Sequence, residues 1–317
     1  MKLTTFMEKA VSLGIDNDLR GRQAIERMLK KKKEKFEKLD EDKKKDYDTE
    51  QLWNPYSDST ILYDSEKEIK RIISGIDIDT SELLLVDRLN EKNPESPFDL
   101  VLAHHPVGKG IKGLYGVMGM QADMFAKQGV AINVAEGLAG PRAKEVQRAV
   151  YPANNQKTVD AAKYLNISLA CTHTIADNHV QIFLEKLVEE KKPETLEDIL
   201  NMLKEIPEYK EAIKHGSGPI IFAGKPDNRA GKIAVSMTGG TSSAKKAYEK
   251  MAAAGVGTII EMHIPEESRK IAEENFMNVV IAGHISSDSL GMNLLLDNFE
   301  KEGIEISACS GFIRVKR

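Results

Sequence analysis

Short apolar runs alternate with longer amphipathic segments over most of the chain. Each run is rich in Ile, Val and Leu and stops near a turn-forming or polar residue, which is typical of a buried strand. Strands separated by helices of about ten or more residues favour βαβ units and a largely parallel sheet. The predicted strands are "IISGIDID", "FDLVLAHH", "ISLACTH", "KIAVSM", "VGTIIEMHI", "NVVIAGHI" and "IEISACSGFIRV", with "GVAINVAE" as a further candidate.

This pattern predicts an α/β protein built from two α/β halves with mostly parallel sheets. A polar helical stretch separates the halves, and a charge-rich segment before the first strand predicts an extra amphipathic helix followed by the turn-rich linker "WNPYSDSTI". The predicted units are an N-terminal helix and linker (residues 1–60), a first half (residues 61–179), a helical insert (residues 180–218) and a second half (residues 219–317).

Composition narrows the class of protein. The 317 residues carry a net charge of −4, so no overall positive field attracts nucleic acid or an anionic membrane. No apolar run reaches the roughly 18 residues of a membrane span, and two cysteines favour a reducing compartment. We therefore expect a cytoplasmic protein. Residues 30–45 hold nine lysines and five acids; a solvated helix face is the preferred interpretation, and a nucleic-acid contact arm is the weaker one.

Five of the seven histidines stand where predicted strands end. The carboxyl edge of the strands is where open α/β sheets bind ligands. A sheet edge lined with imidazole rings therefore indicates a site there. The five are His104, His105, His173, His263 and His284.

Two of these histidines have an aspartate four residues later, in "HTIAD" (His173 and Asp177) and "HISSD" (His284 and Asp288). If a helix begins at each histidine, the imidazole and the carboxylate lie on the same helix face and can bind the same cation. Asp288 as a helix-start residue and Asp177 as a turn former are the alternatives. The adjacent His104 and His105, which a proline follows, can each face a different ion.

The three motifs "LAHHP", "CTHTIAD" and "AGHISSDSLG" resemble the signatures of the Ngg-interacting-factor-three-like family. The family is also known as dinuclear-metal-centre hexameric proteins and as GTP cyclohydrolase I type 2 homologues. The resemblance runs from about Ile72 to the C-terminus and leaves out the helical insert. It implies two divalent metal ions (zinc, iron or manganese) held by His104, His105, Asp177, His284 and Asp288.

By the same resemblance, His173 would orient a ligand or accept a proton, and the chain would assemble into a toroidal homohexamer. The sequence departs from the family pattern at Asp288, where glutamate is usual. Aspartate is one methylene shorter, which puts the bridging of two ions in question.

Two functions follow from these residues. The first is a metal-dependent hydrolase that acts on a small, possibly nucleotide-like substrate with a C–N bond or a phosphate ester, with His173 and His263 as proton-transfer groups. The second is a non-catalytic metal carrier, sensor or protein-interaction partner. An open cavity beside the ions would distinguish the enzyme.

Two loops are further candidates. Residues 238–243, "TGGTSS", are expected to form a tight turn in which Ser242 or Ser243 caps a helix, with anion binding as the alternative. The glycine-rich residues 108–119 are expected to form a surface loop with solvated lysines; contact of Lys109 and Lys112 with a phosphorylated substrate is the alternative.

Overall fold

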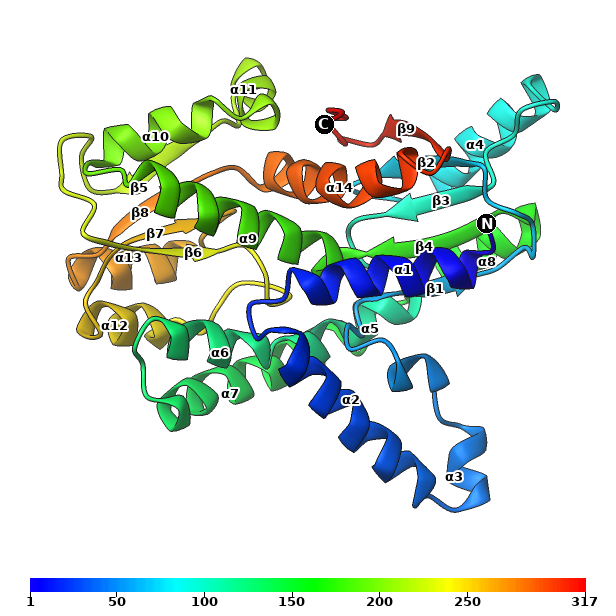
Figure 1. The fold of residues 1–317 in the computed structure, drawn as a ribbon, viewed down its shortest axis with the longest axis horizontal. Helices are drawn as coiled ribbons and strands as arrows, with labels where there is room; N and C mark the ends of the chain where they lie inside the picture. The colour runs from blue at the N-terminus through cyan, green and yellow to red at the C-terminus, as the bar shows by residue number, and fades with distance from the viewer.

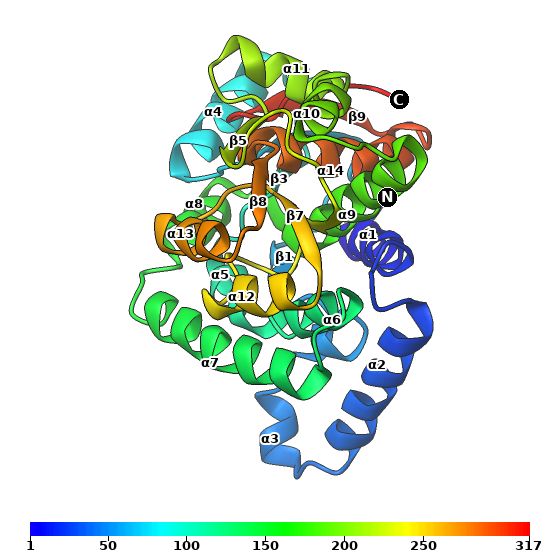
Figure 2. The ribbon, with the colours of Figure 1, turned by 90° about the vertical axis from the view of Figure 1, so that its left-hand side faces the viewer.

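The computed structural model describes residues 1–317 and contains two β-sheets (Figures 1 and 2). The strand orders are β1-β4-β3-β2-β9 and β5-β8-β7-β6. One edge strand in each sheet, β1 or β5, is antiparallel and the other pairs are parallel, which confirms the predicted fold class. The strands are β1 (Ser59–Tyr63), β2 (Arg71–Gly75), β3 (Leu100–Ala103), β4 (Ser168–Thr172), β5 (Ile220–Ala223), β6 (Lys232–Ser236), β7 (Val256–Glu261), β8 (Asn278–Ile281) and β9 (Glu305–Cys309).

Helices cover both faces of the first sheet, so its strands are apolar on both sides. Leu100 and Leu102 of β3 point into one core cluster, whereas Val101 and Ala103 point into another. One face packs against α4 (Thr80–Lys92) and α8 (Lys157–Leu165), and the opposite face packs against α1 (Leu3–Asp16), α9 (His173–Lys191) and α14 (His284–Glu300).

The second sheet is covered in the same way. One face packs against α6 (Met120–Lys127), α7 (Ile132–Val150), α12 (Lys246–Ala253) and α13 (Glu266–Glu274). The other packs against α10 (Leu196–Lys204), α11 (Pro207–Lys214) and, again, α9 and α14. These last two helices therefore belong to the cores of both halves.

Helices α9 and α14 lie side by side and bridge the two sheets (Figure 1). Ile175, at the start of α9, packs in the core of the first sheet, and Leu184, two turns further on, packs in the core of the second. The two backbones come close because Gly291 of α14 has no side chain: a Cβ there would lie 2.4 Å from the carbonyl oxygen of Ala176. No helix of the chain is both long and apolar enough to cross a bilayer.

The N-terminal segment differs from its prediction. The expected single helix is interrupted at residues 38–40, giving α2 (Arg22–Glu37) and α3 (Glu41–Lys45), which extend away from the rest of the chain (Figure 1). Helix α1 precedes them and is part of the core rather than an appendage, because it buries an apolar face on α9 and the first sheet. A short 3₁₀ helix, η1 (Thr49–Leu52), precedes the expected linker, and the last three linker residues begin β1, which pairs with β4.

The segment from residue 108 to residue 150 is helical, contrary to two predictions. The expected glycine-rich loop, residues 108–119, forms α5 (Gly108–Val117) and ends just before α6 begins at Met120. Its glycines allow close packing rather than mobility, because a Cβ at Gly113 would lie 2.0 Å from the carbonyl oxygen of Ser57. "GVAINVAE" forms the start of α7 instead of a strand, and this helix continues through Pro141.

The predicted unit boundaries do not coincide with the ends of the observed elements. Helix α9 continues across residues 179 and 180, where the first half was expected to end. Strand β9, which was expected in the second half, pairs with β2 in the first sheet. The insert consists largely of helices, and Thr195 and Asp198 form a capping box at the start of α10.

The close approach of α9 and α14 predicts opposite effects for two glycine substitutions. Gly291→Ala should lower the free energy of unfolding by roughly 1–3 kcal/mol, because the added methyl group pushes α14 away from Ala176. Gly137 is an exposed residue of α7, and a Cβ added there meets no atom within 4 Å. Gly137→Ala should therefore raise the free energy of unfolding by about 0.5–1 kcal/mol, because alanine has the higher helix propensity. Urea unfolding measures both, and equal stabilisation by the two changes would contradict the packing described here.

Candidate metal centre

Five histidines from both halves of the chain gather at the carboxyl ends of four strands. His104 and His105 follow β3, His173 begins α9 after β4, His263 follows β7, and His284 begins α14 after β8. The ring centroid of His104 lies 5.3 Å from that of His105 and 5.1 Å from that of His173. The ring centroid of His284 lies 5.1 Å from that of His105 and 4.6 Å from that of His263. The rings form one continuous cluster.

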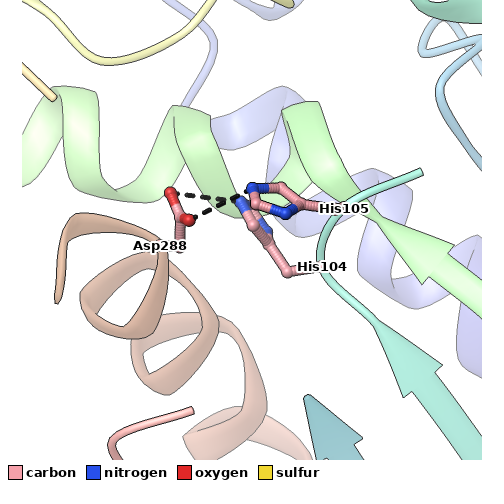
Figure 3. Close-up of side chains that lie close together, drawn as sticks. All are labelled: His104, His105 and Asp288. Atoms are coloured by element: carbon pink, nitrogen blue, oxygen red, sulfur yellow. Dashed lines mark ion pairs between the residues drawn. The ribbon is translucent and has the colours of Figure 1, made fainter. Parts of the chain in front are cut away.

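The Asp288 carboxylate lies among these rings, one turn after His284 on α14 (Figure 3). Its Oδ1 is 3.4 Å from Nε2 of His104, and its Oδ2 is 3.4 Å from Nε2 of His105. The same Oδ2 is 3.6 Å from Nε2 of His284. Asp288 is 1% exposed, so a single buried carboxylate faces three imidazoles from both halves.

Asp177 holds the corresponding place on α9. Its Oδ1 is 3.5 Å from Nε2 of His104, and its Oδ2 is 3.8 Å from Nε2 of His173. Nδ1 of His173 is 2.8 Å from Oδ2 of Asp58, the oxygen that also accepts a hydrogen bond from the Thr174 hydroxyl. Asp58 therefore fixes the His173 ring with its other nitrogen toward the centre.

His105 is oriented in the same manner by a different carboxylate. Its Nδ1 is 2.7 Å from Oδ1 of Asp77, which follows β2. A carboxylate on one ring nitrogen holds the tautomer and raises the basicity of the other nitrogen, as is usual for histidines that bind metals. His105 and His173 both have this support.

The distances between polar atoms at the centre suit ligands that share a cation. Two donors bound tetrahedrally to one zinc ion at about 2.0–2.1 Å lie roughly 3.4 Å apart. Both oxygens of Asp288, Oδ1 of Asp177 and both nitrogens of His104 are buried and have no hydrogen-bond partner. Buried polar atoms without partners are strongly destabilising. The residues therefore fit divalent metal ions, and two groups, His104–His105–Asp288 and His104–His173–Asp177, are compact enough to hold one.

Burial and neighbouring charge move the pKa values at the centre apart. Burial lowers the pKa of His104 to about 4 and raises that of Asp177 to about 8. For Asp288 burial acts in the same direction as for Asp177, but the adjacent histidines outweigh it and hold the pKa of this carboxyl below its ordinary value. His104 is thus neutral and Asp288 ionised near neutral pH, the forms in which both bind metals.

A small cavity of about 60 Å³ opens beside the centre. It is lined by His284 and Asp288 together with His263, Glu261 and residues of the 238–243 loop. Aspartate carboxylates and histidine rings therefore face a cavity with room for only a few atoms.

Glu261 is the buried carboxyl of this cavity wall. Both of its side-chain oxygens are 3.0 Å from the Tyr248 hydroxyl, which can donate to them. Burial raises the pKa of Glu261 to about 8, although the bond from Tyr248 opposes the shift. Glu261 consequently carries a proton at neutral pH.

All seven predicted site residues lie at this centre. Three further carboxyl groups around it were not among the predicted residues, and they differ in whether the sequence could have identified them. Asp77 lies near the end of the predicted strand "IISGIDID", so the rule that found the histidines also points to it. Glu261 stands two residues before His263, near the end of the same predicted strand. Asp58 lies in the expected linker and carries no sequence signal, because its role depends on the pairing of β1 with β4.

Two alternatives, for Lys109 and Lys112, and one expectation, for the 238–243 loop, do not hold. Lys109 does not reach the site, since its Nζ is 3.0 Å from carboxylate oxygens of both Asp48 and Glu50. Lys112 instead donates to backbone carbonyls at the end of α7, including that of Val150. Neither serine of the 238–243 loop caps a helix, because α12 begins at Lys246 without a side-chain cap.

Glu261 predicts a specific pH dependence of stability. The folded protein binds this proton up to about pH 8, whereas the unfolded chain releases it near pH 4.5, so stability is lost as pH rises through this window. Glu261→Gln mimics the protonated form. The variant should be more stable than wild type by roughly a few kcal/mol at pH 9, and the two proteins should be similarly stable at pH 5. Urea unfolding at both pH values checks this, and a parallel pH dependence in the two proteins would contradict it.

No protein-family model matches the chain, and no curated protein does. Among solved structures, it is similar to a NIF3 superfamily protein from Sphaerobacter thermophilus, with 26% identity and a TM-score of 0.70 over 80% of this chain and 91% of that one. Reduced HcgD from Methanocaldococcus jannaschii (18% identity, TM-score 0.48, 77% and 84% covered) and a Bacillus cereus protein related to NIF3 (11%, 0.40, 81% and 92%) are also similar. These two TM-scores are below 0.5, so neither likeness supports an argument.

The abbreviation NIF3 denotes the Ngg-interacting-factor-three family, to which the three motifs already pointed. The Sphaerobacter structure covers most of both chains, and the histidines and aspartates of those motifs converge on one centre in the present fold. The chain therefore resembles the NIF3 superfamily in its fold and in the motifs that meet at this centre.

Proposed function

We propose that the protein holds two divalent metal ions and uses them to hydrolyse a small substrate. The observation that carries this proposal is the environment of Asp288. Each of its oxygens is buried and has no hydrogen-bond donor, and each lies 3.4 Å from a histidine nitrogen contributed by the first half. Such a carboxylate is suited to bridging two cations.

The proposed ligands divide into two sets that share Asp288. His104 and Asp177 would hold one ion with Oδ1 of Asp288, and His105 and His284 would hold the other with Oδ2. Imidazole and carboxylate donors suit zinc, iron(II) or manganese. The reach of Asp288 to histidines of both halves supports a bridging role for aspartate in the position where the family usually has glutamate.

Paired ions, when bound, lower the pKa of a water molecule between them and stabilise charge on the group that it attacks. His173, oriented by Asp58, would accept the proton from the nucleophile. His263 lies on the cavity side of His284, where it would donate a proton to the leaving group. A C–N bond or a phosphate ester at the end of a small molecule fits the size of the cavity.

A metal carrier or sensor is the alternative. Such a protein needs neither a cavity beside its ions nor proton-transfer groups in the cavity wall. His263 and Glu261 line the cavity but are not among the proposed ligands, which favours catalysis over storage.

Elemental analysis of the purified chain should find close to two equivalents of zinc, iron or manganese. Asp288→Asn should lose both ions, because it weakens the group that the two share, whereas His105→Ala should lose one. His215→Ala is the matched control, since this exposed histidine lies at the end of α11, away from the centre, and should keep two equivalents.

Little metal in wild type, even after reconstitution with each cation, would contradict the dinuclear proposal. Two equivalents that survive Asp288→Asn would contradict the assignment of the bridging ligand.

Activity tests the role of His173. In a screen of phosphate monoesters and cyclic C–N substrates, His173→Gln should reduce kcat by about 10²–10⁴-fold while both ions stay bound. Loss of one ion in this variant would make His173 a ligand, as its group with His104 and Asp177 allows. A metal-loaded wild type without activity on any substrate class would favour the carrier or sensor.

The homohexamer and the cytoplasmic location stay predictions. Light scattering on the purified protein measures the first. The lysine-rich arm gives nucleic-acid binding little support, because three of its lysines, Lys43, Lys44 and Lys45, pair with acids of the same segment.

A further inference from the structure

A cationic groove lies next to the candidate metal centre. It has a volume of about 590 Å³ and is bounded by α7, the start of α12 and the residues just before each of α12 and α13. Its charged side chains are four cations and a single acid, although the chain as a whole carries a net charge of −4. They are Arg142, Arg148, Lys245, Lys246 and Glu145.

Two of the four cations have no acidic partner. Arg142 pairs with Glu145 at 3.0 Å, and Lys245 is 3.7 Å from Glu267. Arg148 and Lys246 are exposed and form no ion pair, so their charge is available to a ligand. Positive charge focused in a groove attracts anions.

The groove adjoins the cavity beside the centre. Ser242 and Ser243 line both spaces. The Ser242 hydroxyl is 3.4 Å from Nδ1 of His263, and the His263 ring adjoins that of His284. Arg142 anchors this shared wall, because its Nε donates to the carbonyl oxygen of Ser242.

The two spaces differ greatly in size. The cavity of about 60 Å³ has room for only the reacting end of a substrate, whereas the groove of about 590 Å³ can hold the remainder of a metabolite. Leu138, Pro141 and Pro265 in the groove wall offer apolar surface for a carbon skeleton.

We propose that the substrate is a small metabolite with two separated anionic groups, of the bisphosphate type. Its reacting group lies in the cavity at the centre, and its second phosphate lies in the groove against Arg148 and Lys246. This inference rests on the proposed function and adds a substrate class to it.

Isothermal titration calorimetry on the manganese-loaded chain tests this, with fructose 1,6-bisphosphate, adenosine 3′,5′-bisphosphate and inorganic phosphate as probes. At least one bisphosphate should bind ten or more times as tightly as phosphate. Arg148→Ala combined with Lys246→Ala should remove that advantage. The control, Lys144→Ala with Lys270→Ala, removes the same charge outside the groove and should keep the advantage.

The inference is overturned if both bisphosphates bind no more tightly than phosphate, or if the groove and control variants lose affinity equally. Metal content is measured on the same samples. Two bound ions together with a groove substitution that has no effect would overturn the substrate class alone. An absence of bound metal in wild type would overturn the proposed function instead, whatever the groove binds.

Discussion

A buried carboxylate that receives no hydrogen bond is the constraint on which the arrangement of this protein depends. Asp288 is almost fully enclosed, and neither oxygen has a donor. Removal of an ionised carboxylate from water is strongly unfavourable unless a charge of opposite sign replaces the lost solvent. Three imidazoles surround it, but they stand at the separation of ligands around a cation rather than at hydrogen-bond distance from the carboxylate. The fold thus places at one point a buried negative charge that a nearby positive charge must compensate.

The two helices that carry Asp177 and Asp288 bring residues of both halves to this centre. Helix α9 starts at the edge of the first sheet and α14 at the edge of the second, and each ends in the core of the other half. Their close contact at Gly291 fixes Asp177 and Asp288 relative to one another. Helix α1 supports this pair from outside, with the rings of Phe6 and Phe299 stacked 4.2 Å apart. The geometry of the centre is therefore a property of the shared helical layer, not of a loop.

The sequence predicted the parts of this account that depend on local pattern. Strand runs and the residues at their carboxyl ends are local features, so the fold class and the site histidines could be found without a structure. Features that depend on long-range pairing could not. Strand β9 joins the first sheet, and Asp58 reaches His173, only after the chain has folded. The glycines of α5 suggested a loop, because nothing in the sequence indicates that Ser57 packs against Gly113.

Fold and site together make the protein a scaffold for a candidate metal centre with an adjoining cavity and a cationic groove. The most direct test of the centre is anomalous scattering from crystals of the zinc-loaded chain. The account predicts two peaks about 3.5–4 Å apart, one on each side of the Asp288 carboxylate. A single peak that leaves one oxygen of Asp288 without a partner, or no peak at the centre, would contradict it.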